Sequence, residues 1–150
     1  MGLKSMRERY RVDLLELQTT CEANYIRLLR LLPQMRSQTQ TRRIAMSQGE
    51  HLLGVLALEV IEANPYTTRL RARQENNLAW LPAPELEVQV YHDARMAEVI
   101  STAHTRRIHA RYPYPNASMF QPDEKNQLNH FLGEWLTHCL ACGHESQTLF

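Results

Sequence analysis

The hydrophobic positions near the N-terminus repeat with the spacing of an α-helix. From about Val12 to Leu32 apolar residues recur every three or four positions, and Pro33 follows where the pattern stops. Asn24 falls on the same stripe, so we expect it to be buried and to hydrogen-bond to a neighbouring loop. The stripe consists of Leu14, Leu17, Cys21, Leu28 and Leu31, with Leu15, Tyr25, Leu29 and Leu32 beside it.

After a polar loop the hydrophobic period changes to two, which is typical of β-strands. A turn is predicted at Gln48–Glu50 and a bend at Ala63–Pro65, and a short helical turn or corner at His92–Met96, where Asp93 would cap the helix. The predicted strands are Arg43–Gln48, His51–Glu62, Tyr66–Gln74, Glu85–Tyr91, Ala97–Thr102 and Arg106–Tyr112. The last two of these strands could instead form one long bent strand.

A second helix is predicted near the C-terminus. Pro122 suits its first position, Asp123 and Glu124 fall in its first turn, where the helix dipole favours anions, and Gly143 is a good terminator. Its buried stripe would contain Leu128, Phe131, Leu132, Trp135 and Cys139.

The order helix, adjacent strands, helix predicts a single α+β domain over residues 1–150. Short connections favour an antiparallel sheet, because parallel strands need long crossovers. We therefore expect an antiparallel sheet of about four to six strands, with the N-terminal and C-terminal helices packed on one face.

Two of the predicted strands carry alternating charges. If Tyr66–Gln74 pairs antiparallel with Glu85–Tyr91, odd-numbered residues of both strands share one face, and Arg71 lies on the same face as Glu87. The acidic residues would then neutralise Arg69, Arg71 and Arg73. Weak RNA binding through this basic face stays an alternative, strengthened by the similar alternation of Arg107, His109 and Arg111.

Composition narrows the class of protein. The chain has 150 residues, 43% of them hydrophobic, and a formal net charge of +1, so no global field favours nucleic acid or an anionic membrane. No apolar run is long enough to span a bilayer, and the N-terminus lacks the apolar core of a signal peptide. The three sparse cysteines fit a reducing compartment. We expect a soluble cytoplasmic protein.

Metal or redox chemistry is not predicted. Cys139 and Cys142 form a C-x-x-C motif, but no second pair exists to complete a zinc site. The motif lies at a helix C-terminus, where the dipole opposes a thiolate, so packing is the preferred interpretation. No cofactor is expected, since the sequence has neither a phosphate-binding glycine loop nor an evident catalytic triad order.

Candidate site residues gather at one strand end and in the proline-rich segment Tyr112–Lys125. We expect Arg95 and Arg111 to converge with Lys125 on a shallow site for an anionic group. The alternative is that Asp123 and Glu124 pair with the arginines and close a structural network. The candidate ligand-binding residues are His92, Asp93, Arg95, Arg111, Tyr114, Asn116 and Lys125.

Several segments resemble one known family. They are Cys21-Glu22-Ala23-Asn24-Tyr25, Tyr91–Val99, Arg111-Tyr112-Pro113-Tyr114-Pro115-Asn116, Gln121–Lys125, Gln127-Leu128-Asn129, Phe131-Leu132 and Glu134-Trp135-Leu136. Together they resemble the YqiB-like family of uncharacterised bacterial proteins, over most of the chain from about Asp13 to Gly143. The resemblance implies a bacterial cytoplasmic protein of unknown function, and it supplies no catalytic residues.

The leading hypothesis is a non-enzymatic binding or adaptor protein with a protein partner. The first alternative is a small-anion binder or enzyme that uses the His/Asp/Arg/Tyr cluster with Lys125. The second is a weak RNA binder that uses the basic sheet face. Nucleic acid is not the expected partner, because acidic residues of the neighbouring strand would neutralise that face.

Overall fold

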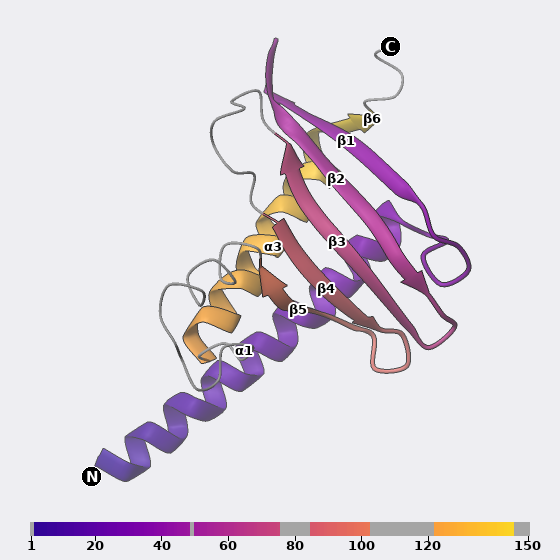
Figure 1. Ribbon diagram of the computed structural model, residues 1–150. Helices are drawn as coiled ribbons and strands as arrows, with labels where there is room; N and C mark the ends of the chain where they lie inside the picture. The colour runs from indigo at the N-terminus through magenta and orange to yellow at the C-terminus, as the bar shows by residue number, and fades with distance from the viewer. Residues whose placement is uncertain (1, 49, 76–84, 103–121, 146–150) are drawn as a thin grey trace, which may run out of the picture.

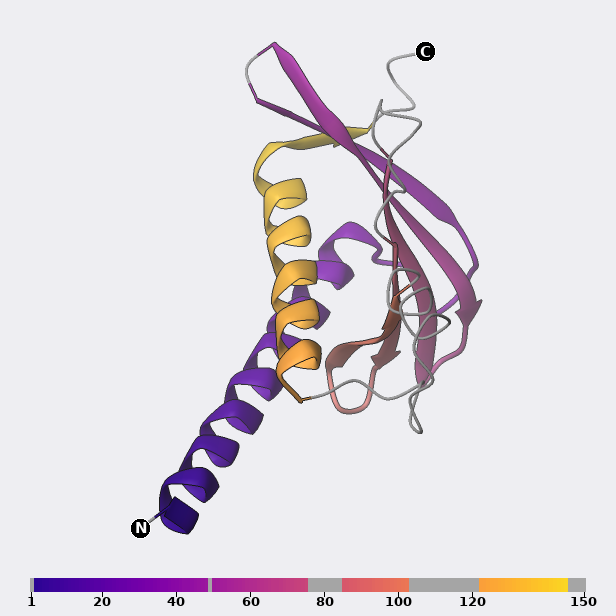
Figure 2. The same cartoon turned by 60° about the vertical axis from the view of Figure 1, so that its left-hand side comes forward.

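The computed structural model describes residues 2–48, 50–75, 85–102 and 122–145. It consists of two layers, a twisted antiparallel sheet and two helices that both lie on one face of it (Figures 1 and 2). This confirms the predicted α+β class. The elements are α1 (Gly2–Leu31), β1 (Thr41–Gln48), β2 (His51–Ala63), β3 (Thr67–Glu75), β4 (Glu85–Tyr91), β5 (Met96–Thr102), α3 (Pro122–Cys142) and β6 (Gly143–Glu145).

The sheet has six strands in the order β5-β4-β3-β2-β1-β6, and β1 to β5 form a meander. The predicted register of β3 and β4 is confirmed, because Arg71 pairs with Glu87 and the odd-numbered residues share the outer face. Residues of the opposite face, such as Leu70, Val88 and Val90, are fully buried beneath the helices. The predicted strand Arg106–Tyr112 lies outside the described residues.

Helix α1 begins earlier than its apolar pattern predicts. It starts at Gly2 rather than near Val12, and it ends at Leu31, just before Pro33, as expected. Its first turns are rich in Lys, Arg, Met and Glu, which have good helix propensity without being apolar. The 30-residue helix is about 45 Å long at a rise of about 1.5 Å per residue. Its N-terminal part therefore projects past α3 and the sheet (Figures 1 and 2).

The segment His92–Met96 is a corner and not a helical turn. The Arg95 amide donates to the His92 carbonyl at 3.3 Å, and Met96 already belongs to β5. Arg95 has a φ of 56°, a left-handed conformation that reverses the chain within the turn and is incompatible with continuing a helix. The expected capping of a short helix by Asp93 is therefore wrong.

Strand β6 was not predicted. It follows α3 directly, and its residues pair with Ile44, Ala45 and Met46 of β1. Gly143 permits this abrupt change, because a Cβ there would lie 2.4 Å from the Cys139 carbonyl oxygen and 2.5 Å from Ile44 Cγ2. Gly143 thus ends the helix as predicted and also opens a strand.

The core lies between the inner face of the sheet and the two helices. Leu28 and Leu132 are fully buried, and Trp135 is buried with 7% of its surface exposed. Leu128 and Phe131, which were predicted to be largely buried, are half-buried and pack against the margin of this core. Phe131 also packs against Trp135, with ring centroids 4.6 Å apart.

Asn24 is buried as predicted, but its partner is not a loop. Its Nδ2 donates to the backbone carbonyl of Asn129 on α3 at 2.9 Å. Asn129 is itself fully buried, and its Oδ1 accepts from the Val99 amide of β5 at 3.0 Å. The two asparagines therefore join α1, α3 and β5, a connection between segments far apart in the sequence.

Candidate functional site

His92 is a buried structural connector at the start of the β4–β5 turn. Its Nε2 lies 2.8 Å from Thr68 Oγ1, and its Nδ1 lies 3.1 Å from the Tyr25 hydroxyl. Thr68 Oγ1 donates to the Met35 carbonyl, so it can only accept from His92. His92 Nε2 is therefore the donor, and Nδ1 accepts from Tyr25.

This network favours a neutral imidazole. Burial lowers the pKa of His92 below its ordinary value of 6.5, and Arg36 acts in the same direction, while Asp93 opposes them. Both ring nitrogens already have protein partners. His92 therefore fastens β3, the β4–β5 turn and α1 together.

Arg95 lies beside the same network. It is exposed, and its guanidinium carbon lies 5.3 Å from the centre of the Tyr25 ring, a cation–π contact. Asp93 is exposed on the same turn. The structure thus brings His92 and Arg95 together through Tyr25, with Asp93 beside them.

The remaining candidate residues are less connected. Lys125, in the first turns of α3, forms an ion pair with Glu98 of β5. Arg111, Tyr114 and Asn116 lie outside the described residues, so the predicted convergence on an anion site stays a prediction.

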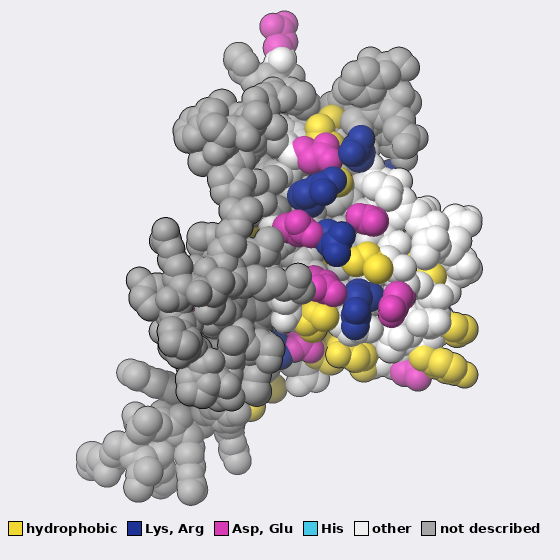
Figure 3. All heavy atoms as spheres, in the orientation of Figure 1, with side chains coloured by type: hydrophobic (Ala, Val, Ile, Leu, Met, Phe, Trp, Pro, Cys, Tyr) yellow, Lys and Arg dark blue, Asp and Glu magenta, His cyan; other side chains and the backbone are white. Residues whose placement is uncertain are grey.

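The arginines of β3 do not form an uncompensated basic face. Figure 3 shows Lys or Arg side chains alternating with Asp or Glu across the outer face of the sheet. Arg71 pairs with Glu85 and, at 3.8 Å, with Glu59; Arg69 lies 3.6 Å from Glu87. Arg43 and Arg73 share Glu75, each at 3.1 Å. The predicted neutralisation by β4 is confirmed for Arg69 and Arg71, through diagonal pairs, whereas Arg73 pairs with Glu75 of its own strand.

The described part of the C-x-x-C motif is structural. Cys139 is buried in the core, and burial raises the pKa of its thiol to about 11. Such a thiol stays protonated and unreactive at neutral pH. Among the described residues, no group of three or more His, Cys, Asp or Glu side chains could hold a metal ion.

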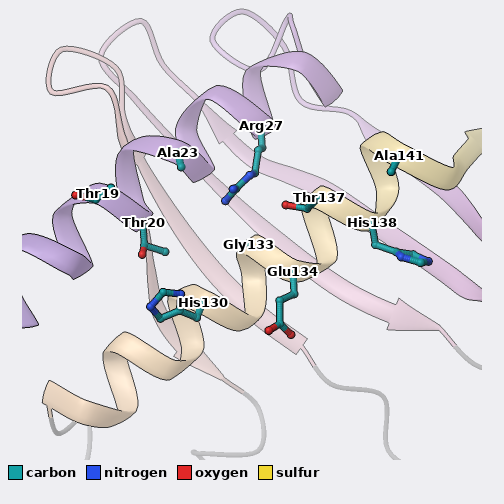
Figure 4. A pocket seen from close by; sticks show the side chains of 10 residues that line it. All are labelled: Thr19, Thr20, Ala23, Arg27, His130, Gly133, Glu134, Thr137, His138 and Ala141. Carbon is teal, nitrogen blue, oxygen red and sulfur yellow. The ribbon is translucent and has the colours of Figure 1, made fainter.

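A groove of about 540 Å³ between α1 and α3 was missed by the sequence analysis. Figure 4 shows Arg27 reaching from α1 towards α3, with Thr137 on the facing side. Ala23 and Gly133 leave room between the helices, since both side chains are small or absent. The sequence signal was present, because Gly133, Thr137 and Ala141 follow one another at four-residue helical spacing.

Other residues of the groove are already engaged. Thr19 and Thr20 donate their hydroxyls to the carbonyls of Leu15 and Glu16, within α1. His130 Nε2 lies 3.0 Å from Glu16 Oε1. The side chain of Glu134 points away from Arg27 (Figure 4). His138 also lines the groove, and its Nε2 has no hydrogen-bond partner among the described residues, but its ring points away from Arg27 (Figure 4). Arg27 and Thr137 are the polar side chains of the described groove that face each other across it (Figure 4).

Comparison with known proteins places the chain in a family. The family model described as "Protein of unknown function (DUF1249)" matches residues 27–145. The chain is 36% identical over 137 residues to the uncharacterized protein YqiB of Escherichia coli strain K12, which covers 91% of this chain and 94% of the relative. The YqiB proteins of E. coli O6:H1 and O157:H7 match with the same identity and coverage.

No solved structure matches the chain significantly. Within the described residues, neither helix has a stretch long and apolar enough to cross a membrane. The resemblance that the sequence motifs indicated is confirmed by the family match and by the relatives. The family model and the similarity to the E. coli YqiB proteins agree: the chain belongs to the DUF1249 family of proteins of unknown function.

Proposed function

We propose that this protein is a non-enzymatic binding domain of the bacterial cytoplasm, and that it docks a protein partner along the projecting part of α1. One observation carries the proposal. Leu14 and Leu15 are 47% and 64% exposed, and they lie where α1 begins to project past α3 and the sheet. Leucines presented on a free helix are typical of helix–helix recognition.

Leu14 continues the face that α1 uses for its own packing, whereas Leu15 lies on the outward side of the helix together with Ile26. Cys21 and Leu28 of that face are buried in the domain, with 2% and 0% of their surface exposed. Leu14 lies seven residues before Cys21, which is about two helical turns and the same side of the helix. Leu17, between them, is half-buried and marks the point where the domain ends. A partner that packs on Leu14 would therefore extend an existing helix interface.

The charge of the segment suggests the chemistry of the partner. Residues 2–13 contain four basic and two acidic residues, a formal charge of +2. The partner we propose is an amphipathic helix of another protein that offers apolar residues to Leu14 and acidic residues to this basic segment.

The state of the candidate ligand-binding residues favours the binding-domain hypothesis over the alternative of an enzyme. Both ring nitrogens of His92 have protein partners, and Lys125 is paired with Glu98. The arginines of the outer sheet face are compensated by glutamates, which argues against RNA as the partner. The described cysteines, Cys21 and Cys139, are free thiols, in keeping with a reducing compartment.

Affinity purification with quantitative mass spectrometry tests the proposal. The baits are the wild-type chain, Leu14→Glu, and Ile26→Glu as a matched control. Ile26 is also 47% exposed on α1, but it lies on the outward side of the helix above the domain. We expect a specific protein with wild type and Ile26→Glu that is lost with Leu14→Glu. Equal recovery with all three baits would contradict docking at Leu14.

The captured protein must then bind directly. Titration of the purified partner should give a dissociation constant at least about tenfold weaker for Leu14→Glu than for Ile26→Glu, because a buried carboxylate lacks a counter-charge. The competing outcome is self-association, in which a second copy of this chain, and not another protein, packs on α1. Light scattering on the isolated protein distinguishes the two, because self-association would give a dimer without any partner.

A further inference from the structure

We propose that the groove between α1 and α3 binds a carboxylate group, and that Arg27 and Thr137 are the residues that hold it. This site lies over the body of the domain and does not depend on docking at Leu14. The groove, about 540 Å³, falls within the usual size range of small-ligand sites. The argument rests on how Arg27 is fixed, on what faces it and on the charges around it.

Arg27 is held in place by Asn24, whose side chain is itself hydrogen-bonded to α3. Its Nη1 donates to Asn24 Oδ1 at 2.8 Å. Asn24 is fully buried and is fixed in turn by its bond to the Asn129 carbonyl. The guanidinium is therefore preorganised, so little side-chain entropy is lost when a ligand binds to it.

Gly133 creates the space that Arg27 occupies. A Cβ at position 133 would lie 3.0 Å from Arg27 Nη1 and 3.0 Å from Asn24 Oδ1. Any other residue at this point of α3 would crowd both atoms. The guanidinium thus lies against the backbone of α3 at the floor of the groove, where its planar fork of donors suits a carboxylate.

Arg27 has no acidic partner within the described part of the chain. No carboxylate oxygen there lies within 4.0 Å of it, and the bond to Asn24 uses only one of its five N–H donors. From the opposite wall, the Thr137 hydroxyl points towards Arg27 (Figure 4). An oxyanion seated between them would accept from both helices.

The neighbouring charges select a singly charged group. Glu134 is one of the residues that line the groove, and Glu16, outside it, is paired with the lining residue His130. Two nearby carboxylates would repel a polyphosphate strongly, whereas a single carboxylate can be balanced by Arg27 alone. The expected ligand group is therefore a monocarboxylate, carried either by a small molecule or by a glutamate of a partner helix.

NMR titration tests this site. Acetate and propionate are added at constant ionic strength, with sodium chloride as the reference, and the backbone amides of Gly133 and Thr137 and the Nε–H of Arg27 are followed. A capped helical peptide with one glutamate is titrated in parallel. Saturable shifts with the small carboxylates assign a small-molecule source, and saturation by the peptide alone assigns a protein source. Shifts that stay linear with every probe overturn the proposal.

Variants identify the residues that hold the group. Arg27→Gln should weaken binding about tenfold or more, since it removes a charge-assisted hydrogen bond. Arg30→Gln, the same charge change at an exposed arginine outside the groove, should bind like wild type. If Arg27→Gln folds poorly, the exposed Thr137→Val decides, with an expected loss of about threefold to tenfold. Identical titrations of Thr137→Val and wild type, or of Arg27→Gln and Arg30→Gln, would overturn the proposal, because it assigns the carboxylate to both residues.

Discussion

At the scale of single residues, the buried polar groups explain how distant segments are joined. Asn24, Asn129 and His92 are each at most 5% exposed, and each makes hydrogen bonds across elements. Such groups contribute little net stability while paired but are costly to leave unpaired. Their loss is therefore the most informative kind of substitution in this protein.

Asn129→Ala should destabilise the protein by about 1–3 kcal/mol, because it leaves the buried Val99 amide without its acceptor. Asn126→Ala is a matched control on the same helix. Asn126 Oδ1 is buried and has no hydrogen-bond partner in the described structure, so removing it should change stability by less than about 0.5 kcal/mol or increase it. Urea unfolding measures both, and equal losses would contradict the assigned network.

His92 should make stability depend on pH. Because burial holds its folded pKa below 6.5, the unfolded chain binds more protons than the folded chain in the window between the two pKa values. The contribution of His92 to the free energy of unfolding is therefore fully present above about pH 6.5. It falls as the pH drops through that window, with a slope of at most about 1.4 kcal/mol per pH unit.

Urea unfolding between pH 5 and 8 measures this effect, and His92→Gln should reduce the slope. NMR titration of the same histidine provides an independent check, with exposed His130 as the internal comparison. A His92 that titrates above 6.5 would contradict the buried neutral imidazole.

At the scale of elements, the two helices differ in what holds them. Helix α3 lies over the sheet (Figure 2), whereas the described side-chain contacts of α1 with α3 begin at about Glu16, which pairs with His130. The buried stripe of α3 centres on Leu132, Leu136 and Trp135. The stability of the two-layer packing therefore depends more on this stripe than on the beginning of α1.

Trp135→Ala should cost about 3–5 kcal/mol, since it removes a large buried ring and leaves a cavity beside Phe131. Leu140→Ala on the same helix is the control. Leu140 is 39% exposed, so its truncation should cost less than about 1 kcal/mol. Thermal and urea unfolding report both values. An unchanged melting midpoint for Trp135→Ala would show that α3 does not pack as described.

Local pattern was sufficient for some elements and insufficient for others. The alternation at Leu70, Ala72, Leu86 and Val88 predicted both the strands and their shared face, because burial on one side leaves a period of two. The start of α1 was missed because its first turns carry charge rather than an apolar stripe. Strand β6 was missed because three residues are too short for any period and pair only through Ile44 to Met46.

Contacts between residues far apart in the sequence were the other feature that the sequence pattern could not predict. The bond from Asn24 to Asn129 spans 105 residues, and no local pattern identifies such a partner. The groove at Arg27 requires two helix faces to meet, and no local pattern around Gly133 predicts which residue of α1 lies opposite it. Of the candidate site, the turn at His92 to Arg95 was located correctly, but the burial of His92 against Tyr25 depends on where α1 lies.

At the scale of the whole molecule, the two faces are chemically different. One face of the sheet is covered by the helices, and the other carries the network of paired charges seen in Figure 3. Because the charges of this network balance one another, the described part of the sheet presents no broad electrostatic field. The outer face is thus suited to solvent, and interactions are expected on the helical side.

The balance can be broken deliberately. Glu85→Gln with Glu87→Gln removes the partners of Arg71 and Arg69 and should increase retention on heparin, with elution at higher salt than wild type. The paired control, Arg69→Gln with Arg71→Gln, should not raise retention. Strong wild-type retention that the arginine substitutions abolish would instead support RNA binding by this face.

Site-specific photo-crosslinking in cells is the most direct test of docking through α1. A photoreactive residue at position 14 should give one discrete cross-linked product with another protein, and the same residue at position 26 should not. Both positions are 47% exposed on one helix, so exposure alone predicts equal reaction. Equal products at both positions, no product at position 14, or a product made only of two copies of this chain would contradict the proposed docking surface.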